Sequence, residues 1–309
     1  MRSTLVLLLA FIAGCVAELD AEEASSSLTA ACVAGQWCVE SPPAAVAAAG
    51  LLLHGVWAVS ASDVFAVGDG GTILRRVNAV WTQQPSGTTA SLHGVWAASS
   101  SDVWAVGGGG VVLRFDGTAW RTIAGVTSSD VEAVWGSSST DVWLAGSGQV
   151  IHWNGTAFSS TGFGGVMLSV SGTGPRDVWV TGENTFLHHF TGAWATVNPG
   201  AGTSTFFAVL AISPTEVWAT DGTINKETMH FIGGRWVGVP TGGGTFNGMS
   251  SLSASDIWGA GGSRVGHWNG TRWTVTQPLG TGASLWSVAA TPGNAWVVGS
   301  NARIAHLTF

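Results

Sequence analysis

A three-residue phrase, Asp-Val-Trp or a close variant of it, recurs seven times along the 309-residue chain. Regular spacing of about 40 residues is typical of propeller blades and of solenoid turns, in which each repeat builds one small structural unit. The phrases are 36 to 40 residues apart, so the chain is limited to an architecture of seven similar units. The aromatic residue of the phrase is Phe65, Trp104, Trp143, Trp179, Trp218, Trp258 or Trp296.

Each repeat divides into four short segments, which are clearest in the second unit. Residues 92–98 (LHGVWAA) and 103–107 (VWAVG) are followed by 111–116 (VVLRFD) and 119–123 (AWRTI). Short segments rich in β-branched and aromatic residues, separated by Ser, Gly or Asp-Gly turns, predict a meander of four antiparallel strands. The middle strands are apolar on both faces, and neighbouring blades of a ring would cover both. We therefore predict an all-β chain that folds as a seven-bladed β-propeller with four-stranded blades.

The seventh unit reaches Phe309 after its third strand, so its fourth strand has to come from elsewhere. Residues 35–42 (GQWCVESP) are similar to residues 79–85 (AVWTQQP), a fourth-strand segment. Pairing the early segment with the seventh unit would remove an open sheet edge. We therefore expect an N-terminal strand to close the ring.

The composition agrees with a strand-rich chain, because 46% of the residues are hydrophobic, only 9% are charged and 45 are Gly. β-branched and aromatic residues favour strands, and Gly favours the turns between them. The formal net charge is −7 and no run of basic residues is present. A nucleic-acid partner requires a cationic surface, so the sequence predicts none.

Residues 1–14 (MRSTLVLLLAFIAG) combine one positive charge with an apolar run that is too short to span a bilayer. This pattern is typical of a signal peptide. The segment Ile12-Ala13-Gly14-Cys15 resembles the lipobox of bacterial lipoproteins, which implies cleavage before Cys15 and a lipid on that residue. An ordinary signal peptide followed by a chance Cys is the alternative. Residues 15–31 are acidic and Ser-rich and predict a solvated tether, which leaves 32–309 for the propeller.

The predicted lipid places the chain in the bacterial cell envelope. In enteric bacteria an Asp after the lipidated Cys retains a lipoprotein at the inner membrane; here the residue is Val16, so we expect the outer membrane. Cys32 and Cys38 remain, and an even pair of Cys in an exported chain predicts a disulfide. Two free thiols are the alternative.

Two sets of polar residues recur with the repeat. One set is basic and lies in the third strand: Arg75, Arg114, His152, His188, His230, His267 and His306. The other set opens the repeated phrase: Asp63, Asp102, Asp141, Asp177, Glu216, Asp256 and Asn294. Equivalent residues in different blades are too far apart to meet at one ion, so we predict hydrogen bonds within each unit rather than a metal site.

Residues that break the repeat are the better candidates for ligand binding. Trp57, Trp96 and Trp135 end the first strand of the first three units only. The predicted equivalents in the other units are Ser171, Leu210, Ser250 and Val288. The fifth unit has an extended loop, residues 221–228, which contains Lys226 and Glu227. We predict these five Trp, Lys and Glu residues as possible ligand contacts, with local packing and a neutral insertion as the alternatives.

Catalytic motifs are missing from the sequence. The chain has no Tyr, and no G-x-S-x-G, H-E-x-x-H or P-loop motif. No pair of acidic residues stands apart from the repeat as the two carboxylates of a glycosidase would. We therefore predict a non-catalytic chain without cofactor, metal or catalytic residues.

The phrase D-V-W-A-V-G followed by a Gly turn resembles the repeats of bacterial WD40/YVTN/BNR-like propeller lipoproteins, such as those of myxobacteria, over about residues 35–309. That resemblance implies the fold and little about function. The combination of G-V-W and D-V-W segments is also similar to tectonin-type lectin repeats. Two functions therefore stay open: a monomeric platform for an envelope protein partner, and a lectin for carbohydrate or lipopolysaccharide. A glycan-cleaving enzyme is a remote third.

Overall fold

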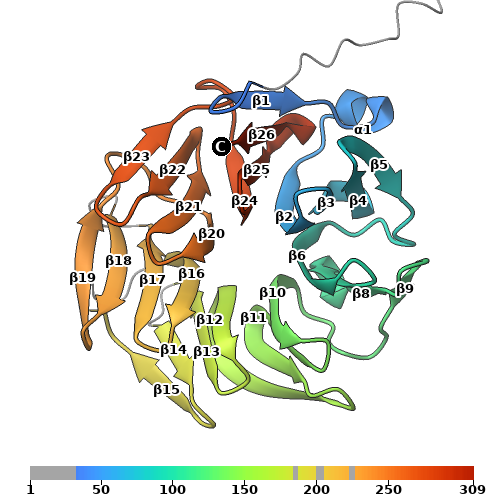
Figure 1. Cartoon of the computed structure of the whole chain (residues 1–309). Coiled ribbons are helices and arrows are strands. Elements are labelled where there is room, and N and C mark those ends of the chain that lie inside the picture. Colours follow the sequence, from blue (N-terminus) through green and yellow to red (C-terminus); the bar gives the residue numbers. More distant parts are fainter. Residues whose placement is uncertain (1–32, 184–186, 200–204, 223–226) are drawn as a thin grey trace, which may run out of the picture. The chain divides into compact units, whose positions relative to one another are not determined.

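The computed structural model describes residues 33–183, 187–199, 205–222 and 227–309. Val33–Phe309 form one compact unit, in which the sheets are arranged as a ring (Figure 1). In each four-stranded sheet the strands pair antiparallel with their neighbours, and the first strand of each repeat unit lies nearest the centre of the ring (Figure 1). The predicted all-β propeller with four-stranded blades is confirmed.

Five sheets have four strands each. The first repeat unit forms β2 (Leu53–Ser60), β3 (Asp63–Gly68), β4 (Thr72–Val77) and β5 (Val80–Gln84). The second forms β6 (Leu92–Ser99), β7 (Asp102–Gly107), β8 (Val112–Phe115) and β9 (Trp120–Thr122). The fifth forms β16 (Phe206–Ser213), β17 (Glu216–Asp221), β18 (Glu227–Ile232) and β19 (Arg235–Pro240). The sixth forms β20 (Gly248–Ser253), β21 (Asp256–Gly261), β22 (Arg264–Trp268) and β23 (Trp273–Thr276). The seventh forms β24 (Leu285–Thr291), β25 (Asn294–Gly299) and β26 (Ile304–Thr308), completed by β1 (Trp37–Glu40).

The third and fourth repeat units share one six-stranded sheet. Its strands are β10 (Val131–Ser138), β11 (Asp141–Trp153), β12 (Phe158–Gly174), β13 (Asp177–Gly182), β14 (Leu187–Phe190) and β15 (Trp194–Val197). The beginning of β12 pairs with β11, and its end pairs with β13. Counted as hydrogen-bonded sheets of the described ranges, the propeller has six blades, so the predicted number of seven is wrong. The reason is the shortest repeat step, 36 residues, which leaves no loop between these two units.

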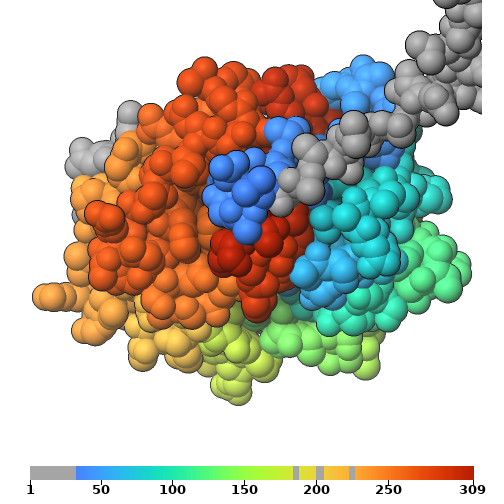
Figure 2. Space-filling view, turned by 45° about the horizontal axis from the view of Figure 1, so that its top comes forward, coloured from blue at the N-terminus to red at the C-terminus, as the bar shows by residue number. Residues whose placement is uncertain are grey.

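The N-terminal strand closes the ring, as predicted. β1 pairs antiparallel with β26, with Trp37 opposite Leu307 and Glu40 opposite Ile304. Figure 2 shows this N-terminal segment in blue against the red C-terminal one. A short helix that the sequence did not indicate, α1 (Ala44–Ala49), leads from β1 to the first unit. Among the described residues, no helix has the length and apolar character needed to cross a membrane.

A buried ion pair joins the closing strand to the first repeat unit. The carboxylate of Glu40 accepts hydrogen bonds from the Arg76 guanidinium at 2.8 Å and from the Trp81 indole N–H at 2.6 Å. His306 of the seventh unit lies 3.1 Å from the same carboxylate. Burial favours the neutral acid, but these partners outweigh it and hold the pKa of Glu40 below its ordinary value. Closure therefore rests on this network as well as on backbone pairing.

The recurring polar residues form a structure that we call the belt: the acid or amide that opens the phrase, the aromatic residue of the phrase, and a third-strand His or Arg. The acid or amide bonds the basic side chain of its own unit at 2.6 to 3.1 Å in all seven units. In five units the His ring stacks on the Trp of the phrase. The predicted bonding within each unit is confirmed.

One belt residue differs from the prediction. In the fourth unit the basic partner of Asp177 is His189, at 2.6 Å, rather than His188. Strand pairing decides this, because Trp179 lies opposite His189. Neighbouring residues of a strand point to opposite faces, so His188 instead contacts the ring of Phe163.

Candidate functional site

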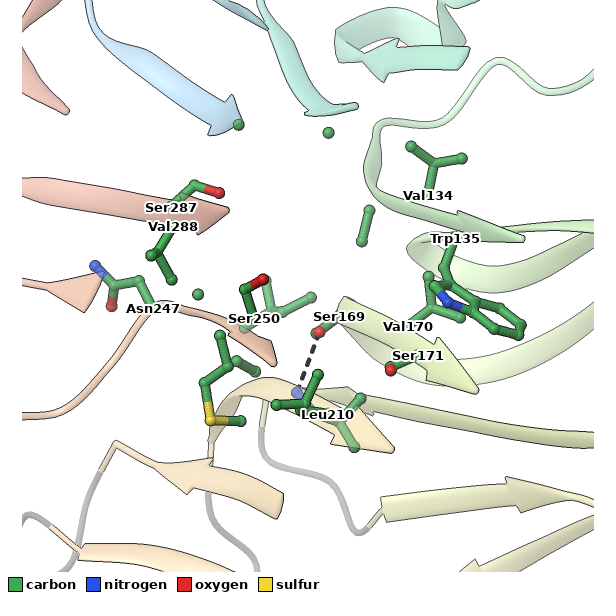
Figure 3. Close-up of a pocket in the computed structure, with 18 of the residues that line it drawn as sticks. Val134, Trp135, Ser169, Val170, Ser171, Leu210, Asn247, Ser250, Ser287 and Val288 are labelled. Atoms are coloured by element: carbon green, nitrogen blue, oxygen red, sulfur yellow. Dashed lines mark hydrogen bonds between the residues drawn. The ribbon is translucent and has the colours of Figure 1, made fainter. Parts of the chain in front are cut away.

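The first strands of the seven repeat units line a central cavity of about 540 Å³. Most of its wall is apolar, with Val134, Val170 and Val288 among the side chains that face it (Figure 3). Serine hydroxyls bridge neighbouring units: Ser169 accepts the N–H of Val209 at 3.2 Å, a contact that Figure 3 marks with a dashed line. Three further bridges run from backbone N–H groups to Ser171, Ser250 and Ser287. Because these bonds join equivalent positions, the first strands start at the same end of the channel.

That end carries a ring of residues that we call the mouth. In each unit one first-strand residue pairs with the belt aromatic, and the mouth residue lies three positions before it in the sequence. In the first unit, for example, Trp57 pairs with Phe65, so the mouth residue is His54. All seven mouth residues line the cavity. They are His54, His93, Glu132, Leu168, Phe207, Asn247 and Trp286. Six residue types occupy seven equivalent positions, so the mouth lacks the repetition of the belt.

Half of the mouth is a continuous ionisable arc. The Nε2 of His54 lies 2.9 Å from Oδ1 of Asp69, which belongs to the single turn η2 (Asp69–Gly71). The His54 and His93 rings meet edge to face with centroids 5.3 Å apart. The Nδ1 of His93 lies 2.9 Å from Oε2 of Glu132, and this contact is an ion pair when the imidazole is protonated. Four ionisable groups from three repeat units therefore form one chain of contacts.

Electrostatics within this arc shift two pKa values in opposite directions. Glu132 is the main cause of the raised pKa of His93; burial opposes it, and Asp130 adds to it. For Asp69 burial favours the neutral acid, but hydrogen bonds from His54, the Leu52 N–H and the Ser91 hydroxyl prevail and lower its pKa. Asp69 therefore stays ionised, and His93 takes up a proton more readily than a free imidazole.

The other half of the mouth is apolar or neutral. Leu168 and Phe207 face the cavity, and Asn247 donates its side-chain N–H to the Leu285 carbonyl at 3.1 Å. Trp286 stands between the two halves, with its ring 5.9 Å from that of His54, and is 40% exposed. The mouth thus combines a charged side, an apolar side and an accessible aromatic surface, which is the arrangement of a binding pocket with a few converging polar groups. Within the described ranges, no three His, Cys, Asp or Glu residues come close enough to hold a metal ion.

The three Trp residues predicted as ligand contacts lie three positions further along their strands than the mouth residues. Trp96 is buried, whereas Trp57 and Trp135 are half-buried and border the cavity. A Cβ atom at Gly136 would lie 2.7 Å from the ring of Trp96, and one at Gly172 equally close to Trp135. Each of these two rings therefore packs on the next unit where only a hydrogen side chain fits, so packing accounts for both.

The other predicted site residues are not brought to the channel. Glu227 begins β18 and does not line the cavity. Lys226, Cys15 and Cys32 lie outside the described residues, and Cys38 lies in β1 opposite His306. Lipidation of Cys15 and the Cys32–Cys38 disulfide therefore stay predictions.

Sequence reasoning missed the mouth, although a signal for it exists. The first-strand segments L-H-G-V-W and V-E-A-V-W have residues of the same kind at every position except the second, which is the mouth residue. That residue is His in the first two units and Glu in the third, whereas the kinds of residue around it recur. In the seventh unit β24 lacks the second register shift, which precedes the hairpin turn in the other six units, so Ala289 and not Val288 lies opposite Trp296. Counting back from Trp296 by the same number of residues as in the other units therefore misplaces the mouth residue, which is Trp286.

No protein-family model matches the sequence, and no curated protein matches it either. Solved structures do resemble it. A catalytically inactive virginiamycin B lyase from Staphylococcus aureus with quinupristin has a TM-score of 0.78 at 10% identity, covering 89% of this chain and 99% of that one. YCF48 bound to D1 peptide has a TM-score of 0.71 at 11% identity, covering 90% and 98%. The WD40 β-propeller domain of Doa1 has a TM-score of 0.71 at 13% identity, covering 83% and 92%. At these identities the similarity shows the β-propeller fold alone.

Proposed function

We propose that this chain is a non-catalytic binding protein of the bacterial cell envelope, whose propeller holds a segment of a protein partner at the mouth of its channel. One observation carries the proposal: at the mouth, equivalent positions of the repeat hold different, partly exposed side chains. A repeated residue serves every unit alike. Residues that differ around a ring give it one particular surface, and a particular surface can select a partner.

The size of the cavity favours a segment rather than a folded domain. A volume of about 540 Å³ accommodates a few side chains, in the range typical of ligand pockets. Peptide binding has a precedent in the fold, since YCF48, one of the similar propellers, was solved with a peptide bound. We therefore expect an extended stretch of the partner to place its side chains in the mouth.

A binding role without catalysis fits the groups at the mouth. Among the described residues that line the cavity, Glu132 is the single carboxylate, whereas glycoside hydrolysis needs two acting on one bond. The carboxylate of Asp69, behind His54, already accepts three hydrogen bonds. These groups are therefore better arranged to hold a ligand than to transfer protons to one.

Binding of carbohydrate is the second candidate, and Trp286 is the observation that favours it. An exposed indole beside a carboxylate and an amide is a combination that can stack on a sugar ring and bond its hydroxyls. A glycan array that includes lipopolysaccharides separates the two functions. Binding that free sugar competes away and Trp286→Ala abolishes would place the lectin first.

The envelope location rests on the sequence pattern around Cys15. Lipidation would tether the propeller to a membrane through residues 15–31, and we propose the outer membrane as that membrane. The full chain should sediment with membranes, and Cys15→Ser should release it to the soluble fraction. Membrane association that persists in the Cys15→Ser variant would contradict the anchor while leaving the binding role open.

In-cell photocrosslinking tests the binding function directly. The photoreactive amino acid p-benzoylphenylalanine is placed at position 286 of the full chain, and at position 80 as the matched control. Val80 is more accessible, 61% against 40% exposed, but it lies on the fourth strand of its sheet, away from the channel. We expect one partner to be crosslinked from position 286 and not from position 80, and the yield to fall in Phe207→Ala. Equal crosslinks from both positions, or none from 286, would refute the proposal.

A further inference from the structure

Among the described residues that line the mouth, no Lys or Arg offsets its negative charge. Of the cavity-lining residues that the structure describes, Glu132 supplies the one formal charge. Two more carboxylates stand directly behind the arc: Asp69, bonded to His54, and Asp130, which accepts the Gly109 N–H at 2.6 Å. When the two histidines are neutral, the mouth therefore attracts cations and repels anions.

The rest of the mouth is apolar or neutral. Leu168 is the neighbour of Glu132 in the ring of mouth residues and Phe207 follows it, while the exposed indole of Trp286 flanks the other end of the arc. Arg and Lys side chains have the matching character, because a charged head sits on an aliphatic stem that packs on apolar surface. A Trp face also attracts a cation.

We propose that the mouth is a subsite for the basic side chain, Arg or Lys, of an extended peptide segment, with Glu132 pairing the charged head and Phe207 and Trp286 covering the stem. The inference rests on the proposed function and specifies the chemistry of its ligand. A guanidinium suits the site best, because it can form two hydrogen bonds to one carboxylate and also stack on an indole.

The ligand has to compete with His93 for Glu132. The charged or titratable groups around His93 are Glu132 and Asp130 on one side and His54, backed by Asp69, on the other. A protonated His93 pairs with Glu132 and adds positive charge, so it opposes a cationic ligand. A neutral His93 releases the carboxylate. Affinity for a basic side chain should therefore rise as the pH rises through the raised pKa of His93.

A pair of nearly isosteric peptides tests the proposal on the full chain in detergent. The probes are capped Leu-Arg-Leu and its twin with citrulline, which keeps the shape of Arg but carries no charge. Calorimetric titration at pH 8 should give the Arg peptide an affinity at least about tenfold higher. Glu132→Gln should reduce the Arg peptide to the citrulline level, whereas Glu227→Gln, a matched change outside the cavity, should leave the difference intact.

Three results would overturn the subsite. They are equal affinity for both peptides, an Arg preference that survives Glu132→Gln, and no detectable binding of the Arg peptide at about 1 mM. A second readout is independent of any variant: affinity for the Arg peptide should increase from pH 6 to pH 8, while that for the citrulline peptide should not. If the subsite fails but position 286 still crosslinks to a partner, the binding function stands and only its cationic ligand is wrong.

Discussion

The belt and the mouth are built from the same seven repeat units and differ in how they use them. In the belt an acid or amide bonds a His or Arg of its own unit seven times, within a narrow range of distances. At the mouth seven equivalent positions hold six residue types, and only neighbouring pairs such as His93 and Glu132 interact.

Packing explains the difference. The belt lies between sheets, where the rings of Trp104, Trp218 and Trp296 are fully buried; their indole N–H groups have no hydrogen-bond partner among the described residues, but the acid or amide of each unit is bonded to its basic side chain. A change there leaves a cavity or an unsatisfied group. The mouth faces an open channel, so its residues can vary at little cost to folding. We therefore expect belt changes to affect stability and mouth changes to affect binding.

Glu40→Ala should cause the largest loss in the free energy of unfolding, because Glu40 of the closing strand supplies the carboxylate that the belt of the seventh unit lacks. The seventh unit has Asn294 in place of the acid, and Glu40 supplies the charge beside His306. Removing it leaves the Arg76 guanidinium, 6% exposed, without its ionic partner. Breaking a buried ion pair in this way costs about 3–5 kcal/mol. Urea unfolding of the full chain measures this loss.

Glu40→Gln is the matched control for that prediction. The amide keeps the shape and can still accept hydrogen bonds from Arg76 and Trp81, so its loss of stability should be smaller. A loss below about 1 kcal/mol for Glu40→Ala, within the range of surface changes, would mean that backbone pairing of β1 closes the ring without the network.

The losses of stability in Asp63→Asn, in the belt, and in Glu132→Gln, at the mouth, can be compared directly. Asp63 accepts two hydrogen bonds of 2.8 Å from Arg75, and an amide can accept only one of them and carries no charge. We expect a loss of about 1–3 kcal/mol in the free energy of unfolding. Glu132→Gln at the mouth should change it by less than about 1 kcal/mol. Equal losses from both variants would remove the distinction between the two regions.

The belt carboxylate of Asp63 should also make the stability of the protein sensitive to acid. Burial raises the pKa of Asp63, but the bonds from Arg75 outweigh it, and the net pKa lies below the ordinary 3.8. The unfolded chain therefore binds a proton at a higher pH than the folded chain, so stability falls as the pH drops below about 4. In Asp63→Asn this part of the pH dependence should be missing, as stability measured from pH 5 to pH 2 would show.

The repeat predicted most of the fold because its signals are local. The D-V-W spacing predicts the strands and the ring, and the likeness of residues 35–42 to a fourth strand predicts β1. The belt bonds follow from the same pattern, since each pair lies within one unit. The number of sheets does not follow from it, because β12 continues through residues 162–166 where other units have a loop.

The mouth could not be predicted because strand register determines it. β24 lacks the register shift that precedes the hairpin turn in the other six units, so Ala289 takes the place of Val288 opposite Trp296 and Trp286 becomes the mouth residue. Pairing in β14 likewise chooses His189 over the adjacent His188. Hydrophobic pattern alone does not fix such one-residue choices, although each one turns a side chain to the other face of its strand.

The smallest expected effect is on the titration of His93. Its pKa is raised chiefly by Glu132, so Glu132→Gln should lower it, as NMR titration of the imidazole would show. A raised pKa means that the pair contributes all its stability below the ordinary value of 6.5 and loses it as the pH rises through the folded value. That contribution should be at most about 1 kcal/mol. His188 is the control: burial alone lowers its pKa, so Glu132→Gln should leave it unchanged. If the pKa of His93 does not move, Glu132 is not its partner in solution, and the competition proposed for the mouth would lose its physical basis.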